Sequence, residues 1–520
     1  MGTTPELGYL ALLPIIILLG GGVLGVLLEA VIGRSQRFVV QCVTTALVIL
    51  AALGVTIWAG ASVPDQLAGV GSVMLDGPAR IAWVLLLVFG LGSLVLVGAR
   101  RASGGDSAFA AMGASIPGSQ AEREASLAHS EHTEIFPLLS FSLGGMLLFT
   151  AANDFLMLFI ALEVFSLPLY LLCGLARRRR LISQEAALKY FMLGALSSAI
   201  FIYGVALVYG YAATFDFRGI DAAIVGNAGS FTMLTIGVGL IGVGLLFKVG
   251  AAPFHSWIPD VYTGAPTAVT AFMAVCTKIA ALFGLLRVLY VAFGSLLWDW
   301  RLVIAIIAVL TMAVGALIGL VQRDVKRLLA YSSIAHAGFL LLGVLAARTA
   351  QTGVVDGQLG SVGSIGYYLL AYGLATIGAF AIVTLVRRSG GEATSLSAWE
   401  GLGRTSPLLG GVMTVFLLSM TGIPTTAGFM GKLFVFSEAW RGGYEWLVLV
   451  AVAFSLVTAA FYLKIVRVMF FSAPAASTEV VSGGVLVTAV IWVCALATIV
   501  LGLVPGAVSG LLAQAATFLR

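Results

Sequence analysis

Long apolar stretches recur along this chain, and they constrain its fold more than any other feature. A membrane-spanning helix needs roughly 20 apolar residues. By that measure we predict about fourteen spans, at residues 8–32, 38–60, 80–99, 135–152, 154–175, 185–212, 231–252, 264–293, 302–321, 326–347, 362–386, 407–440, 446–471 and 484–513. Only 10% of the residues are charged, whereas a soluble domain carries about 25%. The sequence therefore predicts an all-α polytopic membrane protein.

The predicted spans divide the chain into five parts. Residues 1–100 hold three transmembrane helices, 101–134 form a hydrophilic loop, 135–293 and 302–471 each form a five-helix unit, and 484–513 form a C-terminal transmembrane helix. The two units contain spans four to eight and nine to thirteen. Because five is odd, the units have opposite topology, which is typical of the inverted repeats of transporters. We expect spans seven and twelve to be interrupted, because each holds a Pro/Gly-rich segment.

Basic residues predict the orientation in the membrane. The loops on one face carry most of them: Arg34, Arg37, Arg100, Arg101, Arg177 to Arg180, Arg323, Lys326, Arg327, Arg387, Arg388 and Arg404. The other face has only scattered arginines. Cytoplasmic loops of membrane proteins carry the excess of Lys and Arg. This rule places the first set in the cytoplasm and both termini outside, so we attribute the net charge of +5 to topology and expect no nucleic-acid partner.

The stretch from Leu245 to Lys278, LLFKVGAAPFHSWIPDVYTGAPTAVTAFMAVCTK, combines apolar runs with charges and prolines. Lys248, His255 and Asp260 lie in it. A charge at the bilayer centre costs about 2.5–3.5 kcal/mol on insertion scales, and a proline inside a helix removes a backbone hydrogen bond. Both are tolerated only where the segment faces protein or water. This stretch therefore predicts a polar, hinged site inside the membrane.

Five of the six lysines fall inside predicted spans, and only Lys326 lies at a loop; the five are Lys189, Lys248, Lys278, Lys432 and Lys464. Lysine is the residue whose pKa falls most readily on burial, so that it can exchange a proton. Glu163, in the middle of the fifth span, is the candidate partner acid. Separating a Glu–Lys pair would let the lysine release its proton, and joining the pair would hold the proton.

Structural alternatives exist for each of these residues. Glu163, Lys248, Lys278 and Lys432 could form fixed ion pairs. Lys189 and Lys464 lie near the cytoplasmic ends of their spans and could extend to the membrane surface. Two histidines, His255 and His336, could be helix-packing residues or members of a proton relay, and Arg287 could pair locally or reach the rim.

The sequence contains no pattern that predicts a bound cofactor. Its four cysteines, Cys42, Cys173, Cys276 and Cys494, are isolated in apolar runs, without a CxxC or His/Cys cluster, so it gives no sign of an iron–sulfur, haem or zinc site. Dinucleotide and P-loop motifs are also missing. In the 101–134 loop, His129 and His132 with Glu131 and Glu134 could be offered as a metal site, but a solvated loop or surface helix is favoured.

Three motifs carry a resemblance to a known family. The Leu245–Lys278 stretch, RDVKRLLAYSSIAHAG and GIPTTAGFMGKLFVF resemble the antiporter-like, proton-pumping membrane subunits of respiratory complex I, the bacterial NADH-quinone oxidoreductase. The resemblance covers residues from about 135 to 470. The chain looks most like the N-type members: no long lateral helix follows the spans, as in the L type, and Lys432 stands where the M type has glutamate. The runs IALEVFSLPLYLLCGL and EAALKYFMLGALSSAIFIYG also look N-like.

The resemblance implies a proton-translocating role in a complex of the bacterial plasma membrane. It implies that Glu163 and Lys248 are a coupled pair, that Lys278 passes protons along a hydrated axis and that Lys432 faces the outlet. Lys189 matches a sixth-helix lysine, and His255 and His336 belong to the hydrated path. NADH, FMN, iron–sulfur clusters and quinone are implied on other subunits, and none in this chain. Neighbouring membrane-arm subunits, membrane lipids and protons are its implied partners.

Several rival functions share these features. A subunit of a multi-subunit cation/proton antiporter and a subunit of a membrane-bound hydrogenase have the same fold and lysines, and their partner chains separate them from complex I. A free-standing transporter should have a substrate-sized polar pocket away from the lysines, for which the sequence offers no candidate. A purely structural arm of a larger complex would require the buried lysines to be silent.

Overall fold

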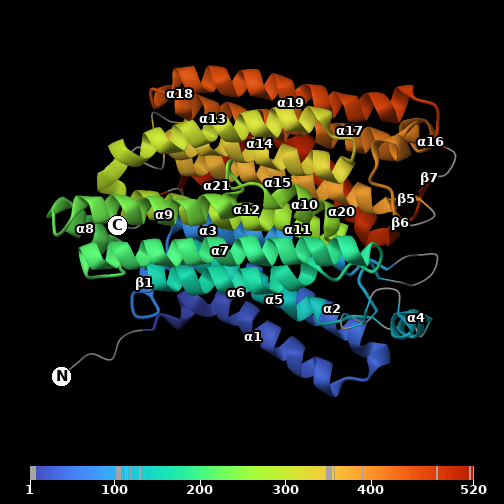
Figure 1. Cartoon of the computed structure of the whole chain (residues 1–520), viewed down its shortest axis with the longest axis horizontal. Helices are drawn as coiled ribbons and strands as arrows, with labels where there is room; N and C mark the ends of the chain where they lie inside the picture. The colour runs from blue at the N-terminus through green and yellow to red at the C-terminus, as the bar shows by residue number, and fades with distance from the viewer. Residues whose placement is uncertain are drawn as a thin grey trace.

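The computed structural model of the chain is a bundle of long helices that run side by side (Figure 1). It describes residues 7–100, 107–111, 113, 115–116, 119–127, 131–346, 354–355, 358–388, 391–475, 478–514 and 517–518. Figure 1 shows helix α8 and strand β1 at one end of the bundle, and α4, α16 and strands β5 to β7 at the other. We refer to this second end, which carries Arg179, Arg327 and Arg387, as the basic end.

The N-terminal part consists of three long helices, α1 (Tyr9–Val31), α2 (Arg34–Ser62) and α3 (Gly77–Val97). Strands β1 (Gln66–Ala68) and β2 (Val73–Leu75) form an antiparallel pair between α2 and α3. The Asp76 side chain caps α3 by accepting a hydrogen bond from the Ala79 backbone at 3.0 Å, and Pro78 stands in the first helical turn, where no hydrogen-bond donor is needed. The short helix α4 (Gln120–Leu127) follows.

The first five-helix unit begins with three continuous helices, which are followed by shorter and segmented ones. Its members are α5 (Ile135–Ala151), α6 (Phe155–Cys173), α7 (Arg180–Ala212), α8 (Phe217–Val225), α9 (Phe231–Val249), α10 (Trp257–Gly264), α11 (Thr267–Phe272), η1 (Met273–Thr277), α12 (Lys278–Arg287), η2 (Val288–Ala292) and η3 (Gly294–Leu296). Segments η1 and η2 are π-helical turns on either side of α12. Such turns are rare and frequent at functional sites.

The second unit and the C-terminal part follow in the same pattern. Their helices are α13 (Leu297–Val321), α14 (Val325–Ala346), α15 (Ser361–Leu385), η4 (Leu396–Trp399), α16 (Leu402–Thr405), α17 (Pro407–Thr421), α18 (Ala427–Arg441), α19 (Glu445–Phe471), α20 (Gly484–Leu503) and α21 (Gly506–Gln514). The strands are β3 (Val354–Val355), β4 (Gln358–Leu359), β5 (Val386–Arg388), β6 (Gly391–Glu392) and β7 (Thr478–Val480). Strand β5 pairs antiparallel with both β6 and β7.

The helical membrane fold is confirmed. Among the described residues, twelve helices are long and apolar enough to cross a membrane, with the segments of 267–292 taken as one. Two further predicted spans correspond to the shorter helix α5 and to the consecutive helices α17 and α18, so the expected number of fourteen agrees roughly with the structure. Spans seven and twelve are interrupted as predicted, since α9 gives way to α10 and α17 to α18. The short strands between helices were not predicted.

The core of the bundle lies between the two units. An 18-residue apolar stretch of α14 and one of the segmented helix from Thr267 to Ala292 are completely buried, whereas the corresponding stretches of α1 and α2 are 33% and 28% buried. Helix α3 packs against α15, α11 and α12, and α10 packs against α14. The central helices are therefore shielded from lipid, and polar side chains on them face protein.

Candidate functional site

The break after α9 is built by a glycine and closed by side-chain hydrogen bonds. Gly250 has a φ of +79°, and its N–H donates to the Leu246 carbonyl at 3.0 Å, which is the glycine-terminated helix end that L-residues disfavour. The Trp257 indole donates to the Phe247 carbonyl at 3.1 Å. In addition, the Ala252 N–H donates to the Thr311 hydroxyl of the second unit at 3.0 Å. The break is thus a fixed part of the fold.

Lys248 lies in the last turn of α9, immediately before this break, with 4% of its surface exposed. Its amine donates to the Ser166 hydroxyl at 2.8 Å and to the Tyr170 hydroxyl at 3.5 Å. Glu163 stands one helical turn before Ser166 on α6, and one of its carboxylate oxygens is buried without a hydrogen-bond partner among the described residues. Both charges therefore lie in one region, but Lys248 bonds to neutral hydroxyls and forms no ion pair with Glu163.

Lys278 begins α12, directly after the π-helical turn η1, and is 2% exposed. Its amine donates to the backbone carbonyl of Ser333 on α14 at 2.5 Å and lies 5.6 Å from the centre of the Tyr372 ring. These two contacts, a carbonyl and an aromatic face, are both neutral. Lys278 links the last helix of the first unit to the second helix of the second unit.

Lys432 lies on α18, just after the second break, and is 6% exposed. Gly422 ends α17 with a φ of +88°, and the Thr421 carbonyl before it accepts a hydrogen bond from the Lys432 amine at 2.7 Å. The Ser455 hydroxyl on α19 accepts a second one, also at 2.7 Å. A carbonyl released at a helix break thus holds this lysine.

His336 lies on α14 and contacts tyrosines from two neighbouring helices. Its Nδ1 is 2.6 Å from the Tyr368 hydroxyl and its Nε2 is 3.1 Å from the Tyr462 hydroxyl. The Tyr462 hydroxyl also bonds to Ser332. Beside this group, a cavity of about 10 Å³ is large enough for a single water molecule. The imidazole is therefore one member of a buried hydrogen-bonded network.

Lys189 and His255 lie apart from these buried groups. The Lys189 amine forms ion pairs with Asp260 at 2.8 Å and Glu185 at 2.7 Å, with 42% of its side chain exposed. Asp260 also pairs with Arg327 at 3.2 Å. His255 stands in the break after α9, and its Nδ1 has no hydrogen-bond partner among the described residues. Lys189 therefore belongs to a network at the basic end.

Sequence reasoning misplaced Lys326, which it put at a loop. The residue lies in the first turn of α14 with 2% of its side chain exposed, and its amine donates to the Ala265 carbonyl of the first unit at 2.8 Å. The predicted span did begin at Lys326, but the surrounding Arg323 and Arg327 suggested a loop. The packing that buries Lys326 comes from residues more than sixty positions away.

The structure also places Arg287, Lys464 and the charged residues of the hydrophilic loop. Arg287 does not reach the rim: it is 1% exposed and donates to both oxygens of Asp76, at 2.6 and 2.9 Å. Lys464 donates to backbone carbonyls at the end of α13 and is only half-buried. In the hydrophilic loop, His132 pairs with Glu134 at 3.1 Å and Glu131 with Arg100 at 2.6 Å. His129 lies outside the described residues.

The three lysines Lys248, Lys278 and Lys432 share an arrangement that suits proton transfer. Each is almost completely buried, each accompanies a helix break or a π-helical turn, and each bonds to hydroxyl or carbonyl oxygens. Hydroxyl groups both donate and accept, so they can pass a proton on. The described residues contain no group of three His, Cys, Asp or Glu that could hold a metal ion.

Two helical units with interrupted helices that carry buried lysines define an antiporter-like membrane subunit. A family model described as NADH:quinone oxidoreductase/Mrp antiporter, transmembrane, matches residues 152–461. NADH-quinone oxidoreductase subunit N of Cutibacterium acnes is 51% identical over 99% of this chain and 96% of its own length, and that of a Nocardioides species is 52% identical over 99% of both. The chain therefore belongs to the NADH-quinone oxidoreductase subunit N family.

Solved structures agree with this assignment. A chain of respiratory complex I from Thermus thermophilus, with bound aureothin, is 33% identical, and the match covers 96% of this chain and all of the other with a TM-score of 0.76. A chain of the Mrp complex from a Dietzia species is 21% identical with a TM-score of 0.78, over 98% of this chain and 96% of the other. That second likeness concerns the fold alone.

Proposed function

We propose that protons cross this subunit by way of Glu163, Lys248, Lys278 and Lys432, with His336 between the last two. As a member of the subunit N family, the chain is a proton-translocating membrane-arm subunit of NADH-quinone oxidoreductase, a translocase of the respiratory chain. The observation that carries the route is the set of three buried amines held by neutral oxygens beside helix breaks. Lys189 and His255 complete the proposed set, at the basic end and in the break after α9.

The proposed mechanism is a gate at the Glu163–Lys248 pair. Quinone reduction elsewhere in the complex drives electrostatic and conformational changes along the membrane arm, and these alter how strongly Glu163 holds the proton on Lys248. The proton then moves by way of Lys278 to Lys432 and out. Moving one charge against 100 mV costs about 2.3 kcal/mol, and one pKa unit corresponds to about 1.4 kcal/mol. A gate that changes a lysine pKa by about two units is therefore of the right size.

The partners are other membrane-arm subunits, including neighbouring antiporter-like chains. We propose that NADH, FMN, iron–sulfur clusters and quinone bind to other subunits. The four cysteines are isolated from one another in sequence, and all four are free thiols. Purification of the tagged chain in mild detergent tests the assembly: NADH-oxidising subunits should accompany it. If only other antiporter-type chains accompany it, the cation/proton antiporter function replaces this one.

We further propose that the basic end faces the cytoplasm and both termini face outward. Membrane proteins concentrate Lys and Arg in cytoplasmic loops, and Arg177 to Arg180, Arg327 and Arg387 support this orientation. Single cysteines introduced near each terminus and in the β5–β6 hairpin test it in intact cells. A membrane-impermeant thiol reagent should label the terminal positions and spare the hairpin; the opposite pattern would reverse the orientation.

The test of the route uses the assembled complex. Lys248→Ala and Glu163→Ala should leave assembly intact and lower proton pumping driven by NADH oxidation, whereas Glu400→Ala, which removes an exposed carboxylate, should not. Lys278→Arg should impair transfer as well, since arginine does not release its proton. Unchanged pumping by assembled Lys248→Ala and Glu163→Ala complexes would refute the route, and full activity of Lys278→Arg would make that lysine structural.

A further inference from the structure

One buried lysine is left without a role by the proposed route. Lys326 is 2% exposed, as deeply buried as Lys278, yet it lies at the basic end of the bundle in the first turn of α14. Burying an ammonium group is costly unless it is paired and hydrogen-bonded. A surface lysine at this point of the chain would serve orientation equally well, so the burial of Lys326 requires its own explanation.

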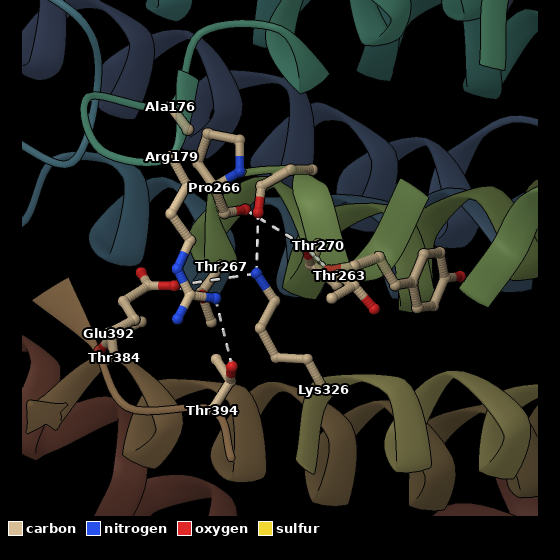
Figure 2. Close-up of polar contacts among 12 residues, drawn as sticks. Ala176, Arg179, Thr263, Pro266, Thr267, Thr270, Lys326, Thr384, Glu392 and Thr394 are labelled. Carbon is tan, nitrogen blue, oxygen red and sulfur yellow. Dashed lines mark hydrogen bonds and ion pairs between the residues drawn. The ribbon is translucent and has the colours of Figure 1, made fainter. Parts of the chain in front are cut away.

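The contacts of Lys326 join the two five-helix units, as Figure 2 shows. Its amine donates to the Ala265 carbonyl, in the turn between α10 and α11 of the first unit, at 2.8 Å. It lies 3.7 Å from the carboxylate of Glu392 on the β5–β6 hairpin. That carboxylate also accepts a hydrogen bond from Thr267 at the start of α11. Lys326 thus meets the segment that joins the interrupted seventh span to the eighth.

A small polar cavity of about 40 Å³ opens beside this contact. It has room for a water molecule, which needs about 10–15 Å³. Lys326 and Glu392 line it together with Arg178, Arg179 and Arg387. A second cavity of about 40 Å³ shares Glu392 and Arg387 and reaches Arg100. Glu392, with 21% of its side chain exposed, therefore stands between Lys326 and water.

Charges of both signs surround the Lys326 amine. The Glu392 carboxylate lies 3.7 Å from it and stabilises a positive charge there, because opposite charges attract. The guanidinium groups that line the cavity oppose it, because like charges repel. Burial lowers the pKa of Arg387 itself, Arg178 adds to that effect, and Glu392 opposes it. The cavity is thus crowded with cations and holds a single carboxylate among its lining residues.

Helix α14 connects Lys326 with the proposed route. Ser333 is seven residues further along this helix, two turns or about 10.5 Å, and therefore on the same face. Its carbonyl accepts the hydrogen bond from Lys278 at 2.5 Å. The Tyr262 hydroxyl of α10 lies near the Ser333 hydroxyl. One face of α14 therefore carries Lys326 at the basic end and, two turns further on, the carbonyl that holds Lys278.

We infer that Lys326 is the proton-loading residue of this subunit, and that Glu392 is the carboxylate through which it exchanges protons with water in the cavity. One proton moves from a cavity water or Glu392 to the neutral Lys326 amine, and then along the α10–α14 interface toward Lys278; no other bond forms or breaks. Because the Lys326 amine also holds the Ala265 carbonyl, the departure of its proton weakens the contact between the units. This inference rests on the proposed proton route.

Substitutions at Lys326 separate proton exchange from a fixed cationic contact. Lys326→Arg keeps the charge and the donors but does not release a proton, and Lys326→Met removes the charge. Lys464→Arg is the matched control, since Lys464 also donates to backbone carbonyls near the basic end but is half-buried and has no carboxylate partner in the described part of the chain. Each variant is measured in the assembled complex by quinone-linked NADH oxidation and by proton pumping in sealed vesicles.

Both Lys326 variants should lower pumping by about tenfold or more, in keeping with the large share that one positioned group contributes to proton transfer. Lys464→Arg should pump normally. If Lys326→Arg pumps at the wild-type rate while Lys326→Met does not, the amine is a fixed contact and the inference is refuted. If Lys248→Ala also pumps normally, the proposed route itself has failed, so the two failures are distinguishable.

Glu392 provides a second test that does not depend on whether an arginine fits the buried site. Glu392→Gln keeps an oxygen for the Thr267 hydroxyl but cannot carry a proton. Glu479→Gln is the matched control, because Glu479 is an exposed carboxylate on strand β7, which pairs with β5 on the side opposite β6. Glu392→Gln should slow pumping severalfold, and Glu392→Asp should restore much of it. Normal pumping by Glu392→Gln would remove the carboxylate from the path and refute the loading step.

Discussion

The buried pair of Asp76 and Arg287 offers the sharpest prediction of stability. It ties the start of α3 to the end of α12, with side chains 0% and 1% exposed and N–O distances of 2.6 and 2.9 Å. Removing one partner of a buried pair leaves an uncompensated charge and costs about 3–5 kcal/mol. Asp76→Asn retains a side-chain oxygen for the Ala79 N–H, so the loss of a helix cap, about 1 kcal/mol, is not added.

A double substitution should recover much of this loss. Asp76→Asn with Arg287→Met removes both charges, and such a replacement is often neutral. The Thr150 carbonyl, which accepts from Arg287 at 2.9 Å, loses its partner, and an unsatisfied buried group costs about 1–3 kcal/mol. The double variant should therefore lose about 1–3 kcal/mol, less than Asp76→Asn alone. Arg287→Met alone should lie between them, because a carboxylate can bind a proton whereas a guanidinium cannot lose one.

The assay compares the amount of assembled complex in membranes and its half-life at raised temperature, because unfolding of a multi-subunit protein is not two-state. A loss of 3–5 kcal/mol corresponds to about 10²–10⁴ in an equilibrium constant. Asp76→Asn should therefore nearly abolish the assembled complex. Wild-type assembly of Asp76→Asn would show that the buried pair does not stabilise the fold. A double variant that assembles no better than Asp76→Asn would show that the loss does not come from the unpaired charge.

Two smaller changes probe the site more locally. A Cβ added at Gly428 would lie 1.8 Å from the Ser419 carbonyl oxygen, so Gly428→Ala should cost upward of about 1–3 kcal/mol and reduce assembly. At Gly411 an added Cβ meets no atom within 4 Å, so the control Gly411→Ala should assemble normally. Equal yields of the two variants would contradict the packing around Gly428. Tyr368→Phe removes the 2.6 Å contact to His336 Nδ1, worth about 0.5–1.5 kcal/mol. It should assemble but pump more slowly, and wild-type pumping would exclude this tyrosine from the relay.

Much of the membrane fold follows from the sequence because apolar run length and bilayer thickness determine it. The first span was expected at residues 8–32 and is found at Tyr9–Val31. The breaks at Gly250 and Gly422 were expected because proline and glycine interrupt helical hydrogen bonding. The burial of Lys248, Lys278 and Lys432 was expected from their places in mid-span or beside these breaks, and all three are no more than 6% exposed.

The contacts between segments distant in sequence could not be predicted. Lys326 is buried by Ala265 and by the β5–β6 hairpin, and no local pattern around it reports that packing. The hydroxyl of Ser166 stands where the Glu163 carboxylate was expected as the partner of Lys248. Lys189 is exposed because Asp260, from the helix after the break, meets it at the surface. Each outcome depends on how the helices pack against one another, and a single sequence has no local pattern that predicts this packing.

The neutral partners of the buried lysines have a consequence for how many charges the route can carry. Lys278 and Lys432 are held by carbonyl, hydroxyl and aromatic groups, and none of these groups cancels a positive charge. In a low-dielectric interior, an ammonium at one position therefore raises the free energy of an ammonium at the next. Protonation of one lysine therefore disfavours protonation of the next. Each arriving proton favours the departure of the one ahead, and protons cross the subunit one at a time.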